Sequence, residues 1–293
     1  MTEGDDLKRL LLEQAGLDVA ALTPAGGESH GTFWITERDG AGSVLKVMPD
    51  ADPGYLSALE AVLARLRDRG YPAPRILVTG HAPGLAFWVQ ERLPGVTPDL
   101  DTLARLLPEI FRLNDAQAAL GHPGPPGRDG WPGELIRTLA EGGAGYCLHG
   151  TLLASPEARD LLPVLRRIGE ESTIPPGRDF VHWDFHPANL LSDGASITGV
   201  IDINPPMLAG DRAFDLATLL FYCWDHAGLH APLRERLLDL AGPGAARAYL
   251  AHMVLRQVEW SLRFHPGTPD TRHYLDLGRR VTADIGSRGY PER

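Results

Sequence analysis

One short polar stretch, together with an aspartate that follows it, constrains the fold of this chain more than any other feature. Residues 182–189 read HWDFHPAN, and Asp202 lies thirteen residues after Asn189 in the apolar segment VIDIN. Asp184 can accept the proton of a hydroxyl group, whereas Asn189 and Asp202 offer oxygen atoms of the kind that Mg²⁺ prefers. The spacing therefore predicts a loop that carries a base and one metal ligand, and a hairpin that returns a second ligand beside them.

The order H-x-D-x-x-x-x-N, followed by an acid on a strand, is typical of the catalytic loop and metal-binding aspartate of kinases. His182 and His186 also have the i, i+4 spacing of zinc ligands. That spacing forms a zinc site only on a helix with an acid between the histidines, and Pro187 disfavours a helix here. We therefore expect His186 to make structural hydrogen bonds.

Composition draws attention to Lys46. The chain contains 26 Arg but only two Lys and three Asn, and two of these Asn, Asn189 and Asn204, fall within the two segments above. Lys46 lies in the apolar segment SVLKV at 43–47, where an unpaired ammonium group would be costly. Chance alone can place so few residues anywhere. Beside the loop pattern, however, we interpret Lys46 as a residue with a specific role.

A helix predicted at 55–69 carries a carboxylate on its apolar side. The apolar stripe consists of Leu56, Leu59, Leu63 and Leu66. Glu60 lies on the same stripe, and a carboxylate that faces a core needs a partner. We predict that Glu60 pairs with Lys46 and orients it toward the α- and β-phosphates of a nucleotide. The alternative is a surface glutamate at the edge of the stripe.

Two further segments are candidates for nucleotide binding. The Gly-rich segment 26–31 is expected to form a hairpin that covers the phosphates, with Ser29 and His30 near the phosphate oxygens. Residues Gln90, Glu91 and Leu93 are expected to bind the base through backbone groups. Backbone contacts leave no side-chain signature, so the choice between ATP and GTP stays open.

The order of elements predicts an α+β fold with two lobes. Strand and turn patterns dominate the first third of the chain, and helical periodicity dominates after Pro94 and Gly95. Later helices are expected at 156–170, 211–224, 245–265 and 271–285, with a Gly/Pro-rich insert at 123–132. We predict a β-rich nucleotide-binding lobe at 1–92 and a mostly helical lobe at 93–293 that holds the catalytic loop and the acceptor site.

Charge and composition exclude several classes of protein. The net charge of -10 disfavours a nucleic-acid partner, and two cysteines provide neither a disulfide framework nor metal-type spacing. The acidic N-terminus does not resemble a signal peptide, and no apolar stretch approaches the roughly 18 residues of a transmembrane helix. We therefore expect a cytoplasmic protein without a membrane partner, present as a monomer or a homodimer.

Taken together, these residues resemble the aminoglycoside phosphotransferase family, which contains antibiotic and small-metabolite kinases with a protein-kinase-like fold. The segment 210–217, GDRAFDLA, adds to the resemblance. The resemblance implies that Asp184 is the catalytic base, that Asn189 and Asp202 hold Mg²⁺, and that Lys46 with Glu60 holds the nucleotide. It also implies that His182 and Asp215 brace the catalytic loop.

The sequence departs from the family pattern at two places. Trp183 stands where relatives often have glycine, which can crowd the loop, and Asn204-Pro205-Pro206 follows Asp202 where relatives usually have no paired prolines. Nothing resembles the D-F-G or A-P-E segments of protein kinases. We therefore do not expect a protein kinase with an activation loop.

The expected activity is transfer of the γ-phosphate of ATP or GTP to a hydroxyl of a small molecule. An antibiotic of aminoglycoside, other sugar-bearing or nucleoside type is the preferred acceptor, which would confer resistance. The alternatives are a metabolic kinase for homoserine, choline or a thioribose, and a non-catalytic binding module. Candidate acceptor-lining residues are Trp224, Asp225, His226, Glu259 and Trp260. The alternative interpretation makes these tryptophans core residues and these acids solvated.

Overall fold

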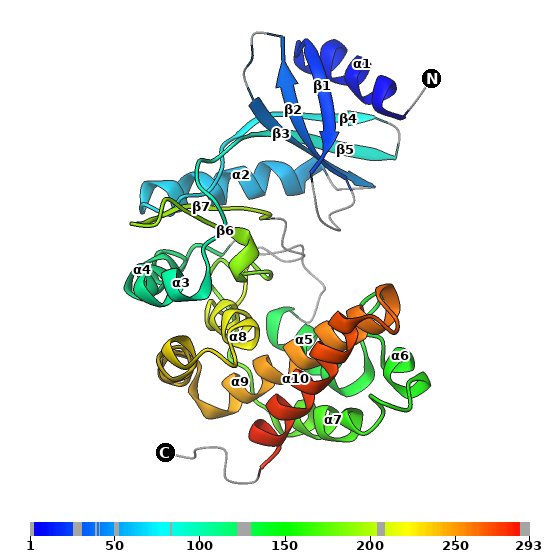
Figure 1. The fold of residues 1–293 in the computed structure, drawn as a ribbon, viewed down its shortest axis with the longest axis vertical. Helices are drawn as coiled ribbons and strands as arrows, with labels where there is room; N and C mark the ends of the chain where they lie inside the picture. The colour runs from blue at the N-terminus through cyan, green and yellow to red at the C-terminus, as the bar shows by residue number, and fades with distance from the viewer. Residues whose placement is uncertain are drawn as a thin grey trace. The chain divides into compact units, whose positions relative to one another are not determined.

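The computed structural model describes residues 3–25, 31–38, 40, 42–49, 53–82, 84–121, 130–203 and 209–287. Contacts between residues divide the chain into two compact units. The first contains Met1–Val96 together with Leu191–Asp193 and Ile197–Ile201, and the second contains the remaining residues. Both units are drawn in Figure 1.

The first unit is built on a five-stranded antiparallel sheet in the order β1-β2-β3-β5-β4. Its strands are β1 (Val19–Pro24), β2 (Thr32–Glu37), β3 (Gly42–Pro49), β4 (Ile76–Ala82) and β5 (Leu85–Glu91). One face carries an apolar cluster that includes Leu45 and Leu11 of α1 (Glu3–Ala15). The other face carries a cluster that includes Trp88 and Leu56 of α2 (Pro53–Asp68). The alternation of side chains along each strand thus lets helices cover both faces.

The register between β3 and β5 determines which face Lys46 occupies. Lys46 lies directly opposite Trp88, and Val44 lies opposite Gln90. Residues directly opposite each other in an antiparallel pair share a face. Lys46 and Gln90 therefore lie on the face of Trp88, which is the face that α2 covers.

Most residues of a short hairpin also belong to the first unit. Its strands are β6 (Leu190–Ser192) and β7 (Ile197–Val200), directly after residues 182–189, the predicted catalytic loop. The Val96 amide donates to the Ser192 carbonyl oxygen over 3.0 Å, and the Ser192 amide donates to that of Val96 over 2.8 Å. Thr198 Oγ1 donates to the Pro94 carbonyl oxygen over 2.6 Å. We expected this hairpin within the lobe 93–293, but its contacts join it to the unit that ends at Val96.

The second unit is helical (Figure 1). Its helices are α3 (Leu100–Arg105), α4 (Leu107–Ala116), α5 (Gly130–Glu141), α6 (His149–Ala154), α7 (Leu161–Glu171), the 3₁₀ turn η1 (Pro187–Asn189), α8 (Ala213–Tyr222), α9 (Ala227–Phe264) and α10 (Pro269–Gly286). Nine of the ten residues of α8 are buried, which makes α8 the centre of this unit. The α+β fold predicted from the sequence is confirmed.

The predicted helices differ from the observed ones mainly at their ends. The helix expected at 156–170 begins at Leu161, because residues 156–160 form turns. The helix expected at 245–265 is the second part of α9, which is kinked where Gly242 has a φ of 73°. No helix among the described residues is long and apolar enough to cross a bilayer.

Candidate active site

The catalytic loop brings Asp184 and Asn189 together, as the spacing predicts. His186 precedes η1 and its Nδ1 accepts the Ala188 amide over 3.3 Å, so His186 makes the structural hydrogen bond that we expected. The turn carries Asn189 back toward Asp184. Asn189 Nδ2 donates to the backbone oxygen of Asp184 over 2.8 Å and to its Oδ2 over 3.2 Å.

The other oxygen of Asp184 contacts an arginine that sequence analysis missed. Arg256 Nη2, from α9, lies 2.6 Å from Asp184 Oδ1. His186 Nε2 lies 3.4 Å from Oδ2. Burial raises the pKa of Asp184, but the charge of Arg256 and the hydrogen bond of His186 together act more strongly and hold this pKa well below its usual range. Asp184 is therefore a carboxylate at neutral pH.

Asp215 holds the start of the loop, at His182 and Trp183, by hydrogen bonds to the backbone. Its carboxylate is fully buried and accepts the amides of His182 over 2.8 Å and Trp183 over 3.0 Å. Gln117 Nε2 donates to the same carboxylate over 2.6 Å. Burial raises the pKa of Asp215 to about 7, against the opposite effect of these hydrogen bonds. His182, also buried, accepts the Asp184 amide at Nδ1 over 3.3 Å.

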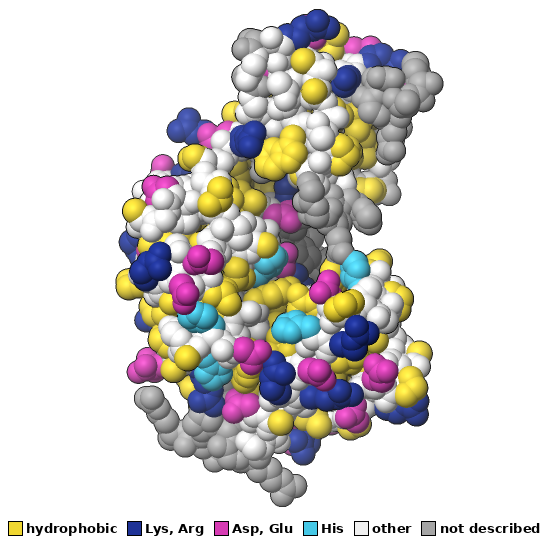
Figure 2. All heavy atoms as spheres, in the orientation of Figure 1, with side chains coloured by type: hydrophobic (Ala, Val, Ile, Leu, Met, Phe, Trp, Pro, Cys, Tyr) yellow, Lys and Arg dark blue, Asp and Glu magenta, His cyan; other side chains and the backbone are white. Residues whose placement is uncertain are grey.

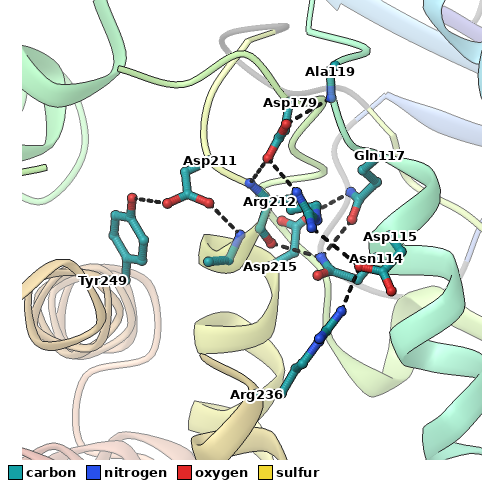
Figure 3. A network of polar contacts seen from close by, with 11 residues as sticks. Asn114, Asp115, Gln117, Ala119, Asp179, Asp211, Arg212, Asp215, Arg236 and Tyr249 are labelled. Carbon is teal, nitrogen blue, oxygen red and sulfur yellow. Dashed lines mark hydrogen bonds and ion pairs between the residues drawn. The ribbon is translucent and has the colours of Figure 1, made fainter. Parts of the chain in front are cut away.

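A wider polar network supports Asp215 (Figure 3). Asn114 Nδ2 donates to Gln117 Oε1 over 2.8 Å and to the carbonyl oxygen of Arg212 over 2.9 Å. Arg212 in turn pairs with Asp179 over 3.2 Å. Through Arg212 and Asp215, the segment 210–217 thus connects the helices around it to the predicted catalytic loop.

Trp183 of the predicted catalytic loop and Asp202, the predicted metal ligand, have left-handed backbone conformations. Trp183 has a φ of 73° and Asp202 a φ of 60°. Residues other than glycine adopt positive φ values infrequently. The ring of Trp183 is buried and lies 5.1 Å from the ring centroids of both Trp131 and Phe214. The expected crowding by Trp183 is thus accommodated inside the helical unit. Asn204-Pro205-Pro206, the second departure from the family pattern, lies outside the described residues.

The nucleotide candidates of the first unit have several different partners. Lys46 is buried on β3. The Glu60 carboxylate contacts Arg67 and accepts the Ile76 amide over 3.2 Å, so sequence analysis missed Arg67 as a partner of Glu60. The pairing of Glu60 with Lys46 stays a prediction. Ser29 and His30 lie outside the described residues.

Two of the three residues expected to bind the base, Gln90 and Glu91, lie at the end of β5. Gln90 Oε1 accepts the indole N–H of Trp88 over 3.2 Å, and Glu91 Oε1 accepts the Arg75 amide over 2.9 Å. Leu93 is half-buried. These contacts involve side chains. That the backbone groups of this segment bind the base stays a prediction.

The candidate acceptor residues lie near opposite ends of α9. His226 precedes the helix and lies 3.1 Å from Asp101, Asp225 pairs with Arg280 over 2.7 Å, and Trp224 packs edge-on against His230. At the other end, Trp260 packs against His265.

Glu259 is fully buried, and its Oε1 accepts the Thr151 hydroxyl over 3.1 Å. Its Oε2 has no hydrogen-bond partner among the described residues.

The donor set suits Mg²⁺ better than a metal that needs an all-protein cage. Within the described parts of the chain, no group of three or more His, Cys, Asp or Glu residues could hold a metal ion. Mg²⁺ needs only one or two protein ligands when phosphates and water complete its shell. Asn189 directs its amide nitrogen at Asp184, so its amide oxygen is the atom that would serve in the predicted role of metal ligand.

Three known proteins are similar to this chain in sequence or in fold. The hygromycin-B 4-O-kinase of Escherichia coli is 27% identical over 278 residues, which cover 87% of this chain and 79% of that protein. The amicoumacin kinase hAmiN, solved with AMP-PNP, Ca²⁺ and Ami, is 15% identical with a TM-score of 0.62 and covers 99% of this chain and 94% of its own. Choline kinase LicA from Streptococcus pneumoniae is 14% identical with a TM-score of 0.62 and covers 95% of this chain and 99% of its own.

The two solved structures show a shared fold. The sequence profile of the phosphotransferase enzyme family matches residues 21–251, a range that includes Lys46, the catalytic loop, Asp202 and Asp215. Because this match spans most of the chain, the protein belongs to the phosphotransferase enzyme family, and its resemblance to the aminoglycoside phosphotransferases is confirmed.

Proposed function

We propose that this protein transfers the γ-phosphate of ATP or GTP to a hydroxyl group of an antibiotic that carries sugar rings. The observation that carries the proposal is the Asp184 carboxylate, which is ionised and held between Arg256 and Asn189 on the catalytic loop. An ionised, fixed carboxylate can accept the hydrogen bond of a substrate hydroxyl and aim its oxygen at a phosphorus atom.

The low pKa of Asp184 suits phosphoryl transfer in particular. In a loose transition state the attacking oxygen has formed little of its bond to phosphorus. Its proton therefore leaves late, and a weak base is sufficient. Asp184 then contributes mainly by orienting the nucleophile. Its ionisation at neutral pH makes it ready to accept a hydrogen bond without prior loss of a proton.

Asn189 and Asp202 would hold Mg²⁺. When bound, the ion bridges phosphate oxygens and neutralises the charge that develops on them. Lys46 would contact the α- and β-phosphates, with Glu60 as the residue that orients it. Ser29, His30, Gln90, Glu91 and Leu93 remain candidates for the rest of the nucleotide site.

Similarity to the hygromycin-B kinase, whose name states an antibiotic substrate, favours an antibiotic acceptor and a role in resistance. The shared fold with a choline kinase keeps a metabolic hydroxyl as the second candidate. Glu259 stays a candidate residue of the acceptor site, with its Oε1 already paired with Arg263 over 3.1 Å. Trp224, Asp225, His226 and Trp260 are further candidate residues of the acceptor site.

We propose a cytoplasmic location and no nucleic-acid partner. Figure 2 shows acidic and basic side chains mixed over the helical unit on the face in view, rather than a continuous basic field. Nucleic-acid binding needs such a field. The net charge of -10 supports the same inference.

The test is turnover with ATP or GTP and Mg²⁺ against a panel of hygromycin-type and other aminoglycosides, nucleoside antibiotics, choline and homoserine. Mass spectrometry would detect the mass of one added phosphate on the acceptor. The proposal expects phosphorylation of at least one antibiotic. Phosphorylation of choline or homoserine alone would favour the metabolic kinase, and no transfer to any acceptor would contradict the proposal.

A further inference from the structure

Arg256 contacts two consecutive residues of the catalytic loop. Its Nη2 donates to Asp184 Oδ1 over 2.6 Å, and its Nη1 donates to the backbone oxygen of Trp183 over 2.5 Å. The planar fork of a guanidinium group can satisfy two acceptors at once, which an ammonium group does less well. Arg256 therefore fixes the carboxylate of Asp184 relative to the backbone that carries it.

The backbone that Arg256 holds is the strained one. Trp183 has a φ of 73°, and a bulky residue keeps such a conformation only where its surroundings enforce it. The amide of Trp183 donates to Asp215 Oδ1 over 3.0 Å, while its carbonyl oxygen accepts from Arg256. The peptide groups on both sides of the strained residue are thus held by side chains, those of Asp215 and Arg256.

The two oxygens of Asp184 have unequal environments. In the part of the chain that the structure describes, Oδ1 is contacted by Arg256 at 2.6 Å. Oδ2 has longer contacts, 3.2 Å to Asn189 Nδ2 and 3.4 Å to His186 Nε2. Distances near the upper limit of hydrogen bonding indicate weaker partners. Oδ2 is therefore the oxygen better able to accept a further hydrogen bond.

We propose that Arg256 is a positioning residue of the phosphotransfer site, which holds the Trp183–Asp184 segment and occupies Oδ1 so that Oδ2 meets the acceptor hydroxyl. This inference rests on the proposed function. It adds α9 to the elements that determine the geometry of the catalytic loop. The sequence pattern of the loop does not include Arg256, because Arg256 lies 67 residues after Asn189.

Arg247 offers a matched control on the same helix. It also donates to one backbone carbonyl, that of Ile285 over 2.7 Å, and to one carboxylate, that of Glu171 over 3.1 Å. Arg247→Met therefore removes the same kinds of contact as Arg256→Met, but away from the catalytic loop. General loss of stability should be similar in the two variants.

The experiment measures both variants in the full chain. Hydrogen exchange of a peptide that covers 182–189 should be faster in Arg256→Met and unchanged in Arg247→Met. In Arg256→Met, kcat should fall on the order of 10²-fold, the cost typical of a misplaced catalytic group, while KM for the nucleotide stays within about two-fold. Arg256→Lys should recover part of kcat, because an ammonium group can replace one of the two contacts.

Equal loop exchange and equal kcat in Arg256→Met and Arg247→Met would overturn the inference. If Arg256→Met does not fold, Arg256→Lys provides the same comparison, and exchange and kcat equal to those of the wild type would again overturn it. Failure of the wild type to phosphorylate any acceptor would contradict the proposed function instead. The exchange measurement needs no acceptor and still decides whether Arg256 holds the loop.

Discussion

The two oxygens of the Asp184 carboxylate have different partners, so each neighbouring residue contributes differently to the position of this side chain. Arg256 holds Oδ1, whereas Asn189 and His186 approach Oδ2 more loosely. Asp215 holds the amides of His182 and Trp183 from the other side. The proposed base Asp184 and the residues that hold the loop around it, Arg256 and Asp215, are thus separate residues, which mutation can distinguish.

Substitution of the metal ligands should produce losses that added metal partly restores. Asn189→Ala and Asp202→Ala should reduce turnover by weakening Mg²⁺ binding, and raised Mg²⁺ or Mn²⁺ should offset this by mass action. Titration of the rate with each metal measures the effect. If added metal never changes the residual rate of a variant, that residue is not a ligand.

The pairing of Lys46 with Glu60 can be tested by a double-mutant cycle on nucleotide KM. Lys46→Ala and Glu60→Ala should each raise KM, and the double variant should lose less than the sum because the two residues act as one unit. Arg67→Ala is the control, since Arg67 contacts the Glu60 carboxylate. Full additivity would instead make Glu60 a structural partner of Arg67 and the Ile76 amide.

At the scale of elements, close backbone contacts place the catalytic loop. Asp179 and Gly210 exchange two backbone hydrogen bonds of 2.9 Å and so join the segment before the loop to the segment before α8. Gly177 lies against this bridge, where a Cβ atom would come within 2.0 Å of the carbonyl carbon of Gly210. A side chain at this position would therefore force the backbone around Gly210 to shift.

Gly177→Ala should therefore destabilise the protein by about 1–3 kcal/mol, the usual cost of overpacking. Gly150→Ala is the control, because a Cβ atom at Gly150 meets nothing within 4 Å and the residue lies in α6. It should be neutral or stabilising by up to about 1 kcal/mol. Chemical denaturation of both variants measures the difference. Equal stability of the two would contradict the packing at Gly177.

The sequence predicted elements whose signals are local. The loop 182–189, the strand of Lys46 and the buried helix α8 all carry their own periodicity or spacing. The start of α7 and the full length of α9 were missed. Gly242 and Pro243 are a normal signal for the end of a helix, yet the chain continues as α9 through a kink. Tertiary packing decided these ends.

Contacts between residues far apart in sequence were not predictable from one sequence. Arg256 could have been noticed as a charged residue among buried neighbours such as Leu255 and Val258, but its contact with Asp184 depends on how α9 packs. The contact of Glu60 with Arg67 was within reach, because both lie on α2. The position of Glu60 on the apolar stripe led us to pair it with Lys46 instead.

At the scale of the whole molecule, the candidate residues fall into two groups. Lys46, Glu60 and Gln90 belong to the sheet unit, whereas Asp184, Asn189 and Asp202 belong to the helical unit. A phosphotransferase needs both a nucleotide-binding and an acceptor-activating set, and the family match spans both groups. The proposed chemistry should therefore fail when either set is removed, but for different kinetic reasons.

Replacement of Asp184 tests the central claim most directly. Asp184→Asn keeps an oxygen for Arg256 and the shape of the loop, so nucleotide affinity should stay nearly intact. Turnover should fall by roughly 10²–10⁴-fold, the range of a positioned general base. Asp193→Asn is the control, because Asp193 is exposed in the turn between β6 and β7 and should leave the rate almost unchanged.

The decisive measurement is kcat of Asp184→Asn with a phosphorylated acceptor and saturating nucleotide and Mg²⁺. A loss of this size, with nucleotide binding retained and Asp193→Asn close to wild type, is the result that the account predicts. An Asp184→Asn protein that transfers phosphate at nearly the wild-type rate would contradict the account and remove Asp184 from the mechanism.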